Sequence, residues 1–128
     1  MRPLSRLTRR FSISADGASA LEFAIVAPAF LTCLVGAFYV CEMAFASVCL
    51  NYAVESAARC YSVKTTVCTD ASSTQTYATS HFVGPKVSPT FVASTATCGH
   101  KVTGSINFTL DLGVSKQVLP INASSCAP

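Results

Sequence analysis

The sequence predicts an α+β protein in which one long N-terminal helix is followed by a small antiparallel β-sheet domain. An uncharged apolar run, FAIVAPAFLTCLVGAFYVC, occupies residues 23–41, and neither glycine nor proline interrupts residues 43–60. After residue 60 the composition changes to Ser, Thr and alternating apolar residues, with Gly and Pro between them. We therefore divide the chain into a basic leader, an N-terminal helix and an exported domain, at residues 1–17, 18–60 and 61–128.

The apolar run is long enough to cross a membrane, because a helix needs about 20 residues to span the hydrocarbon core. Four arginines precede it, opposed only by Asp16: Arg2, Arg6, Arg9 and Arg10. Positive residues are retained in the cytoplasm, so the N-terminus is predicted inside and the C-terminal part outside a bacterial inner membrane, in a single-pass topology. After the leader the charges cancel, which leaves no basic face for nucleic acid.

A cleaved secretory signal is the main alternative for this N-terminus. The apolar core of such a signal is usually only about 7–15 residues and is followed by a small-x-small site, whereas this run is longer and a helical pattern follows it. Arg9-Arg10-Phe11 matches a twin-arginine export signal only in part. A helix over residues 18–60 would be roughly 65 Å long and would project well beyond the bilayer. Glu55 and Arg59 would form an i, i+4 pair on it.

Small side chains recur every four residues along this helix, with Phe45 as the exception: Cys33, Ala37, Cys41, Cys49, Ala53 and Ala57. Such a ridge lets two helix backbones approach closely. The alternative is that the ridge has no special role, because on a helix that is apolar on all sides any regular spacing selects apolar residues. The three cysteines on it are predicted to be free packing residues and not redox centres.

Glu22 and Pro28 are unusual residues at the start of the span. A carboxylate at the membrane edge is costly unless it has a partner, so Glu22 is either a functional site or a hydrated side chain at the headgroup level. Pro28 removes one backbone donor and strains the preceding turn. It predicts a weak point or a simple kink in the helix.

The exported part is predicted to begin with a short helix or ordered loop over residues 69–81. Residues 91–97 and 102–110 are rich in β-formers, and Cys98-Gly99-His100 between them suits a hairpin turn. The second of these strands has one apolar face, formed by alternate residues: Val102, Gly104, Ile106, Phe108 and Leu110. A third strand is predicted at residues 118–123, with Pro120 marking it as an edge strand. The antiparallel sheet would pack on the helix.

Four cysteines in this exported part suggest two disulfides, since disulfides form in oxidising compartments. Three pairings are possible. We favour Cys60–Cys68, which closes a short loop where the long helix ends, and Cys98–Cys126, which fastens the C-terminal tail to the hairpin.

The basic leader ends at Gly17, and Glu22 and Phe23 follow it as the fifth and sixth residues counted from Ala18. Four further features are Pro28, Glu42, the AVESAAR segment and the Cys-x-Pro ending in SSCAP. Together these features resemble the TadE/TadF-like minor pseudopilins of the tight-adherence (Flp-type) branch of type IV pili, in which Ala18 would be the first mature residue. The resemblance spans nearly the whole chain, and only loosely its central polar region.

This resemblance implies cleavage between Gly17 and Ala18 by a membrane-embedded prepilin peptidase. Glycine leaves the backbone accessible to the enzyme. Glu22 could then pair with the new Ala18 ammonium of a neighbouring subunit and set the register of assembly. The implied partners are the inner membrane, the peptidase, other pilins and pseudopilins, and the assembly platform. The implied role is a structural subunit in pilus biogenesis, surface adherence and biofilm formation.

No arrangement of residues predicts an enzyme. His81 and His100 are the only histidines, and no catalytic triad, carboxylate pair or nucleotide-binding motif can be nominated. Cys98-Gly-His100 lacks a second Cys/His pair at zinc spacing, so we expect no metal and no cofactor, and His100 is predicted as a solvated turn residue. The competing function is an unprocessed single-span envelope protein whose exported domain binds a partner.

Overall fold

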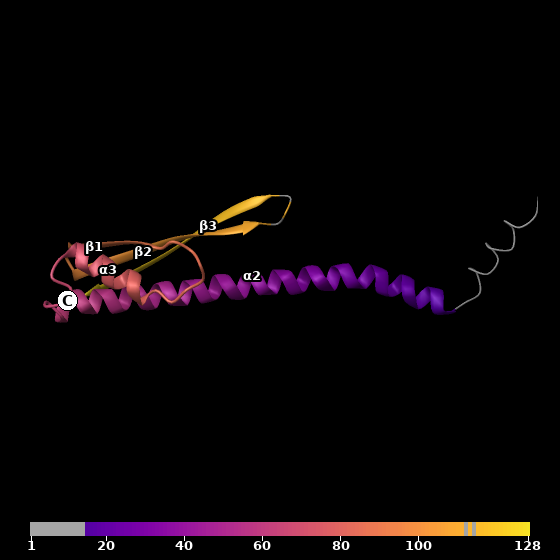
Figure 1. The fold of residues 1–128 in the computed structure, drawn as a ribbon, viewed down its shortest axis with the longest axis horizontal. Helices are drawn as coiled ribbons and strands as arrows, with labels where there is room; N and C mark the ends of the chain where they lie inside the picture. The colour runs from indigo at the N-terminus through magenta and orange to yellow at the C-terminus, as the bar shows by residue number, and fades with distance from the viewer. Residues whose placement is uncertain (1–14, 112, 114) are drawn as a thin grey trace, which may run out of the picture. The chain divides into compact units, whose positions relative to one another are not determined.

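The computed structural model describes residues 15–111, 113 and 115–128. The four leader arginines lie outside these residues. Five elements follow one another along the chain (Figure 1): α2 (Ala15–Val63), α3 (Ala71–His81), β1 (Thr90–Ala96), β2 (Gly99–Asp111) and β3 (Lys116–Ala127). This order confirms the predicted α+β class. The chain divides into two compact units, one ending at Phe38 and the other comprising Tyr39–Pro128.

Helix α2 is uninterrupted over 49 residues and extends three residues beyond the predicted range at each end. Pro28 lies inside it without breaking it, although proline has no N–H for the carbonyl of Ala24. Just beyond the proline, the Thr32 hydroxyl donates to the Ala29 carbonyl at 2.8 Å. The helix therefore passes through its predicted weak point intact.

Helix α3 begins after Asp70, two residues later than the predicted helix. The backbone N–H of Ser73 donates to the Asp70 carboxylate at 2.7 Å, and the N–H of Asp70 donates to the Ser73 hydroxyl at 3.0 Å. This reciprocal capping box satisfies donors that a helix start leaves free, and it fixes where α3 begins.

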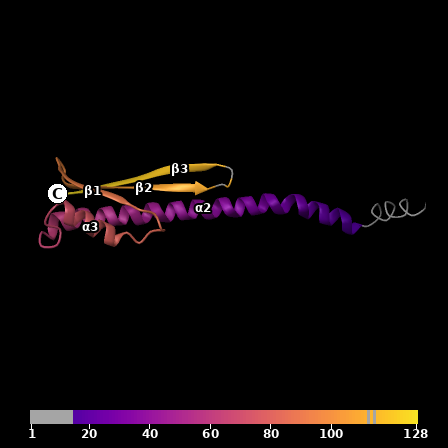
Figure 2. The ribbon, with the colours of Figure 1, turned by 45° about the horizontal axis from the view of Figure 1, so that its top comes forward.

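The sheet has the order β1-β2-β3 with both pairs antiparallel. Figure 2 shows its three strands together in one layer. Ala96 pairs with Gly99, so the hairpin turn is Thr97-Cys98, and the predicted turn at Cys98-Gly99-His100 is wrong by one residue. Gly99 is the first residue of β2 and has φ 115°, a conformation that side chains disfavour.

Strand β3 is longer than predicted at both ends. Pro120 lies within it, opposite Asn107, and β3 is an edge of the sheet as Pro120 predicted. The salt bridge between Lys116 and Asp111, with an N–O distance of 3.2 Å, joins β2 and β3 where the two strands are connected.

The core lies between the inner face of the sheet and the second half of α2. The predicted alternation in β2 is confirmed, because Val102, Ile106 and Phe108 are buried. Gly104 belongs to the same face. A Cβ there would lie 2.8 Å from Val54 and 2.9 Å from Leu50. The sheet thus approaches the helix closely because this position has no side chain.

Two disulfides close the domain, and they are the pairings favoured from the sequence. Cys60–Cys68 joins the end of α2 to the segment before α3, and Cys98–Cys126 joins the β1–β2 turn to the end of β3. The Ser62 hydroxyl also donates to the Ala127 carbonyl at 3.0 Å. The C-terminal tail is therefore attached both to the sheet and to the helix.

Candidate processing and assembly site

The predicted processing and assembly residues all lie in α2. Gly17 and Glu22 are exposed, and Phe23 is 74% exposed. Glu22 follows Ala18 by four residues, which places the two positions one turn apart on the same side of the helix. Among the described residues, no cation is paired with Glu22. A carboxylate beside the apolar run thus remains available to an outside partner.

The following turns of α2 present large apolar side chains on every side: Leu21, Phe23, Ile25, Val26, Phe30, Leu31, Leu34, Val35, Phe38 and Val40. Of the described helices, one is long and apolar enough to cross a membrane, at Ser19–Val63, and its apolar window is entirely unburied. Transfer of such side chains from water into an apolar environment is favourable. The helix is consistent with a single-pass membrane anchor.

The predicted ridge of small residues is not a single continuous surface. Ala53 and Ala57 are completely buried in the chain's own core, whereas Cys41 is exposed. Cys49 is half-buried, and its thiol donates to the Val83 carbonyl at 3.3 Å. The ridge is divided because the sheet covers its C-terminal part, so that part cannot serve a neighbouring helix. Cys33, Cys41 and Cys49 are free thiols, as predicted.

Exposed residues Val48 and Tyr52 were not singled out by the sequence pattern. They are 67% and 62% exposed, on the side of α2 away from the core. One sequence signal could have identified this exposed side of the helix. It is the alternation of three- and four-residue spacings from Cys41 to Arg59. Apolar residues on the neighbouring faces of the helix obscure this signal in the sequence.

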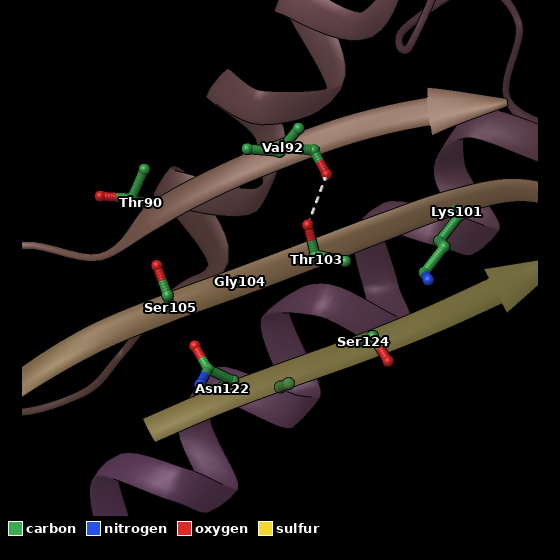
Figure 3. A pocket seen from close by; sticks show the side chains of 9 residues that line it. Thr90, Val92, Lys101, Thr103, Gly104, Ser105, Asn122 and Ser124 are labelled. Carbon is green, nitrogen blue, oxygen red and sulfur yellow. Dashed lines mark hydrogen bonds between the residues drawn. The ribbon is translucent and has the colours of Figure 1, made fainter. Parts of the chain in front are cut away.

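The outer face of the sheet is polar and slightly hollow. A cavity of about 490 Å³ on it (Figure 3) is lined mainly by hydroxyl and amide side chains: Thr90, Thr103, Ser105, Asn122 and Ser124, with Val92 and Lys101. The Thr103 hydroxyl donates to the Val92 carbonyl at 3.3 Å. Lys101 is the single ionisable side chain in this set, so the face offers hydrogen bonds without an acid–base pair.

The two histidines lie apart in the fold. His81 stacks on Tyr77, with ring centroids 3.9 Å apart. His100 is not the solvated turn residue that the sequence predicted. It lies inside β2, its ring is 4.1 Å from that of Tyr61, and its buried Nδ1 has no partner among the described residues. Within the described ranges, no group of three or more His, Cys, Asp or Glu side chains could hold a metal ion.

The described chain consists of a long apolar helix that continues into a small α+β domain with two disulfides. Residues 17–59 match the family model described as TadE-like protein. This match covers about a third of the chain and shows similarity to the TadE-like family over these residues. The match begins at Gly17 and ends at Arg59, so it covers most of α2 and none of the sheet. No curated protein and no solved structure matches the chain.

Proposed function

We propose that this protein is a minor pseudopilin, a structural subunit that takes part in assembly of a tight-adherence (Flp-type) pilus, and thereby in adherence and biofilm formation. The observation that carries the proposal is the position of the family match. It starts at Gly17, the residue that ends the predicted leader, and it includes Glu22, Phe23 and Pro28. Its partners would be other pilins and the assembly platform, and it would have no enzymatic activity of its own.

The membrane orientation proposed for the subunit is N-terminus in the cytoplasm and C-terminal domain in the periplasm. The leader arginines support this orientation. Both disulfides lie in the C-terminal unit, beyond the apolar run, where an oxidising compartment would allow them to form. The exposed thiols Cys33 and Cys41 lie within the apolar run itself.

Cleavage between Gly17 and Ala18 by a prepilin peptidase would change the electrostatics of the subunit. It would remove four arginines and one aspartate, leaving five basic and five acidic side chains. The leader arginines, which direct the orientation of insertion, would thus be removed once the helix is in the membrane. A new ammonium group would appear at Ala18, one turn before Glu22.

In the assembly, the Glu22 carboxylate would pair with the Ala18 ammonium of a neighbouring subunit. The exposed position of Glu22 supports this role, because an intramolecular partner is missing among the described residues. In an apolar environment an unpaired charge is strongly unfavourable, so one such pair would select one register between neighbours.

N-terminal sequencing of the membrane-extracted protein tests the processing step. We expect the mature chain to start at Ala18, and Gly17→Val to abolish this start, because a β-branched side chain would obstruct the peptidase. A chain that keeps Met1 in cells with an active peptidase would refute the proposal and favour the unprocessed envelope protein.

The role of Glu22 requires a separate experiment. Glu22→Ala should leave cleavage largely intact and reduce recovery of the subunit in sheared pilus fractions, with Glu22→Asp as the matched control that keeps the charge. Normal incorporation of Glu22→Ala would show that the carboxylate is incidental.

A further inference from the structure

Helix α2 carries an exposed stripe on its exported half that the chain's own domain does not use. The stripe consists of six residues at alternating spacings of four and three: Cys41, Phe45, Val48, Tyr52, Glu55 and Arg59. All six are exposed, and the side chains of Phe45, Val48 and Tyr52 are each more than half exposed. We call this surface the exported stripe.

The opposite side of the same helix is fully occupied. Leu50, Ala53 and Ala57 have no exposed surface and pack in the core under the sheet. Since the core fixes how α2 is rotated, the exported stripe points away from the sheet. It also begins where the predicted span ends, at residue 41, so lipid covers little of it. Apolar side chains at this density on an aqueous helix face indicate a contact surface.

We propose that the exported stripe binds the same stripe of a second copy of this chain, in a parallel and in-register helix pair. The steps of four and three residues repeat every seven residues, which is the repeat of a left-handed helix pair in which such positions face the partner. The parallel direction rests on the proposed membrane orientation, because copies inserted the same way point the same way.

The charged residues at the end of the stripe, Glu55 and Arg59, are complementary to the same two residues of a second copy. Glu55 and Arg59 already pair within one helix, at 2.7 Å between their charged atoms. In a parallel pair, Arg59 of each copy would lie one turn from Glu55 of the other, which permits two reciprocal ion pairs. A stripe with a single sign of charge would repel its own copy, whereas this stripe attracts it.

The stripe is short, which defines the conditions under which it can act. Its 19 residues extend about 27 Å along the helix, too little for a stable helix pair between molecules free in water. Membrane anchoring raises the effective concentration of the copies and keeps them parallel. The paired state therefore belongs to the full-length protein in a bilayer or micelle.

Cys41 provides a chemical probe of this contact. Its exposed thiol lies on the stripe, so pairing would bring two Cys41 thiols together across the interface. Cys49 lies on the flank of the helix, where it is half-buried and donates to Val83. Copper(II) phenanthroline oxidises two adjacent thiols to one disulfide, with release of two protons and transfer of two electrons to two Cu(II) ions.

The experiment uses the full-length protein in native membranes, treated with copper phenanthroline and analysed on non-reducing gels. We expect a reducible dimer of two identical copies, with a Cys41–Cys41 peptide found by mass spectrometry. The dimer should be lost in Cys41→Ser. Intact Cys60–Cys68 and Cys98–Cys126 peptides in the same digest would show that the domain remained folded.

Matched variants in the Cys41→Ser background test the geometry. Val48→Cys, on the stripe, should restore the dimer, whereas Asn51→Cys, which is also exposed but lies on the flank of the helix, should not. Equal dimer from both variants, or none from Val48→Cys, would overturn the proposal. A mixed disulfide with a different protein would also overturn it, because the occupant would then not be a second copy. N-terminal sequencing of each variant separates these failures from a failure of processing at Gly17.

Discussion

Gly104→Ala should destabilise the exported domain, because β2 lies close to α2 at this residue. The added methyl group would lie 2.8 Å from Val54 Cγ2 and 2.9 Å from Leu50 Cδ1 and Phe91 Cε1. Ordinary contacts between carbon atoms are about 3.5–4.0 Å, so all three neighbours would have to move. They belong to one buried cluster, in which a movement of one side chain compresses the next.

The expected size of the effect follows from two opposing contributions. Overpacking of a core costs about 1–3 kcal/mol, and replacement of glycine recovers about 0.4–1 kcal/mol through the unfolded chain. We therefore expect a net loss of about 1–2 kcal/mol in the free energy of unfolding, and a urea midpoint lower by about 0.3–2 M. Pulse proteolysis of the full-length protein in detergent micelles, over a urea series, measures this midpoint.

The control for this prediction is the next residue on the same strand. Ser105 faces outward and is exposed, so Ser105→Ala should leave the urea midpoint within experimental scatter. A Gly104→Ala protein as stable as the wild type would mean that the helix and sheet are not in close contact here, and the packing described above would be wrong.

Three further predictions concern the ends of the elements. Replacing both Cys98 and Cys126 by alanine should lower the free energy of unfolding by about 3.5 kcal/mol, by the loop-entropy relation for a separation of 28 residues. Removal of Cys60–Cys68, whose separation is 8 residues, should lower it less, and the urea midpoints of the two variants measure the difference. Hydrogen bonds from the backbone and then the side chain of Ser73 hold the pKa of the Asp70 carboxyl below its ordinary value. This contribution to stability is present above about pH 4 and is lost as the pH falls through the lowered pKa, so Asp70→Asn should lose more stability at pH 6 than at pH 3, measured by thermal melts. Gly99→Ala should reduce the yield of folded protein, assayed by protease resistance, because Gly99 has φ 115° and its Cβ would overlap the tail carbonyl.

The secondary structure was largely predictable, because each element has a local signal. Residues 43–60 lack glycine and proline, so the helix continues past the span. The alternation from Val102 to Phe108 marks the inner face of β2. The two disulfides were favoured from the sequence because one closes a short loop at the end of the long helix and the other fastens the C-terminal tail to the hairpin. The hairpin turn was placed one residue late, since Gly99 resembles a turn residue but pairs within the strand.

The faces of α2 were not predictable from the sequence. A helix that is apolar on all sides has no polar face to indicate which side is exposed. The four-residue ridge from Cys33 to Ala57 was therefore as plausible a contact surface for a second helix as any other side of α2. Only the sheet shows that Ala53 and Ala57 are core residues, and that Val48 and Tyr52 face outward. Long-range packing determines which side of α2 is buried, and the local spacing of residues does not encode that packing.

The attachment of the C-terminal tail has a mechanical consequence. The end of β3 is bonded covalently to the β1–β2 turn through Cys126, and Ser62 at the end of α2 holds the next residue, Ala127. Chain termini normally fray, because few contacts hold them. Here the disulfide and the Ser62–Ala127 hydrogen bond hold the C-terminal end of β3, so this edge strand cannot separate from β2 by fraying from that end.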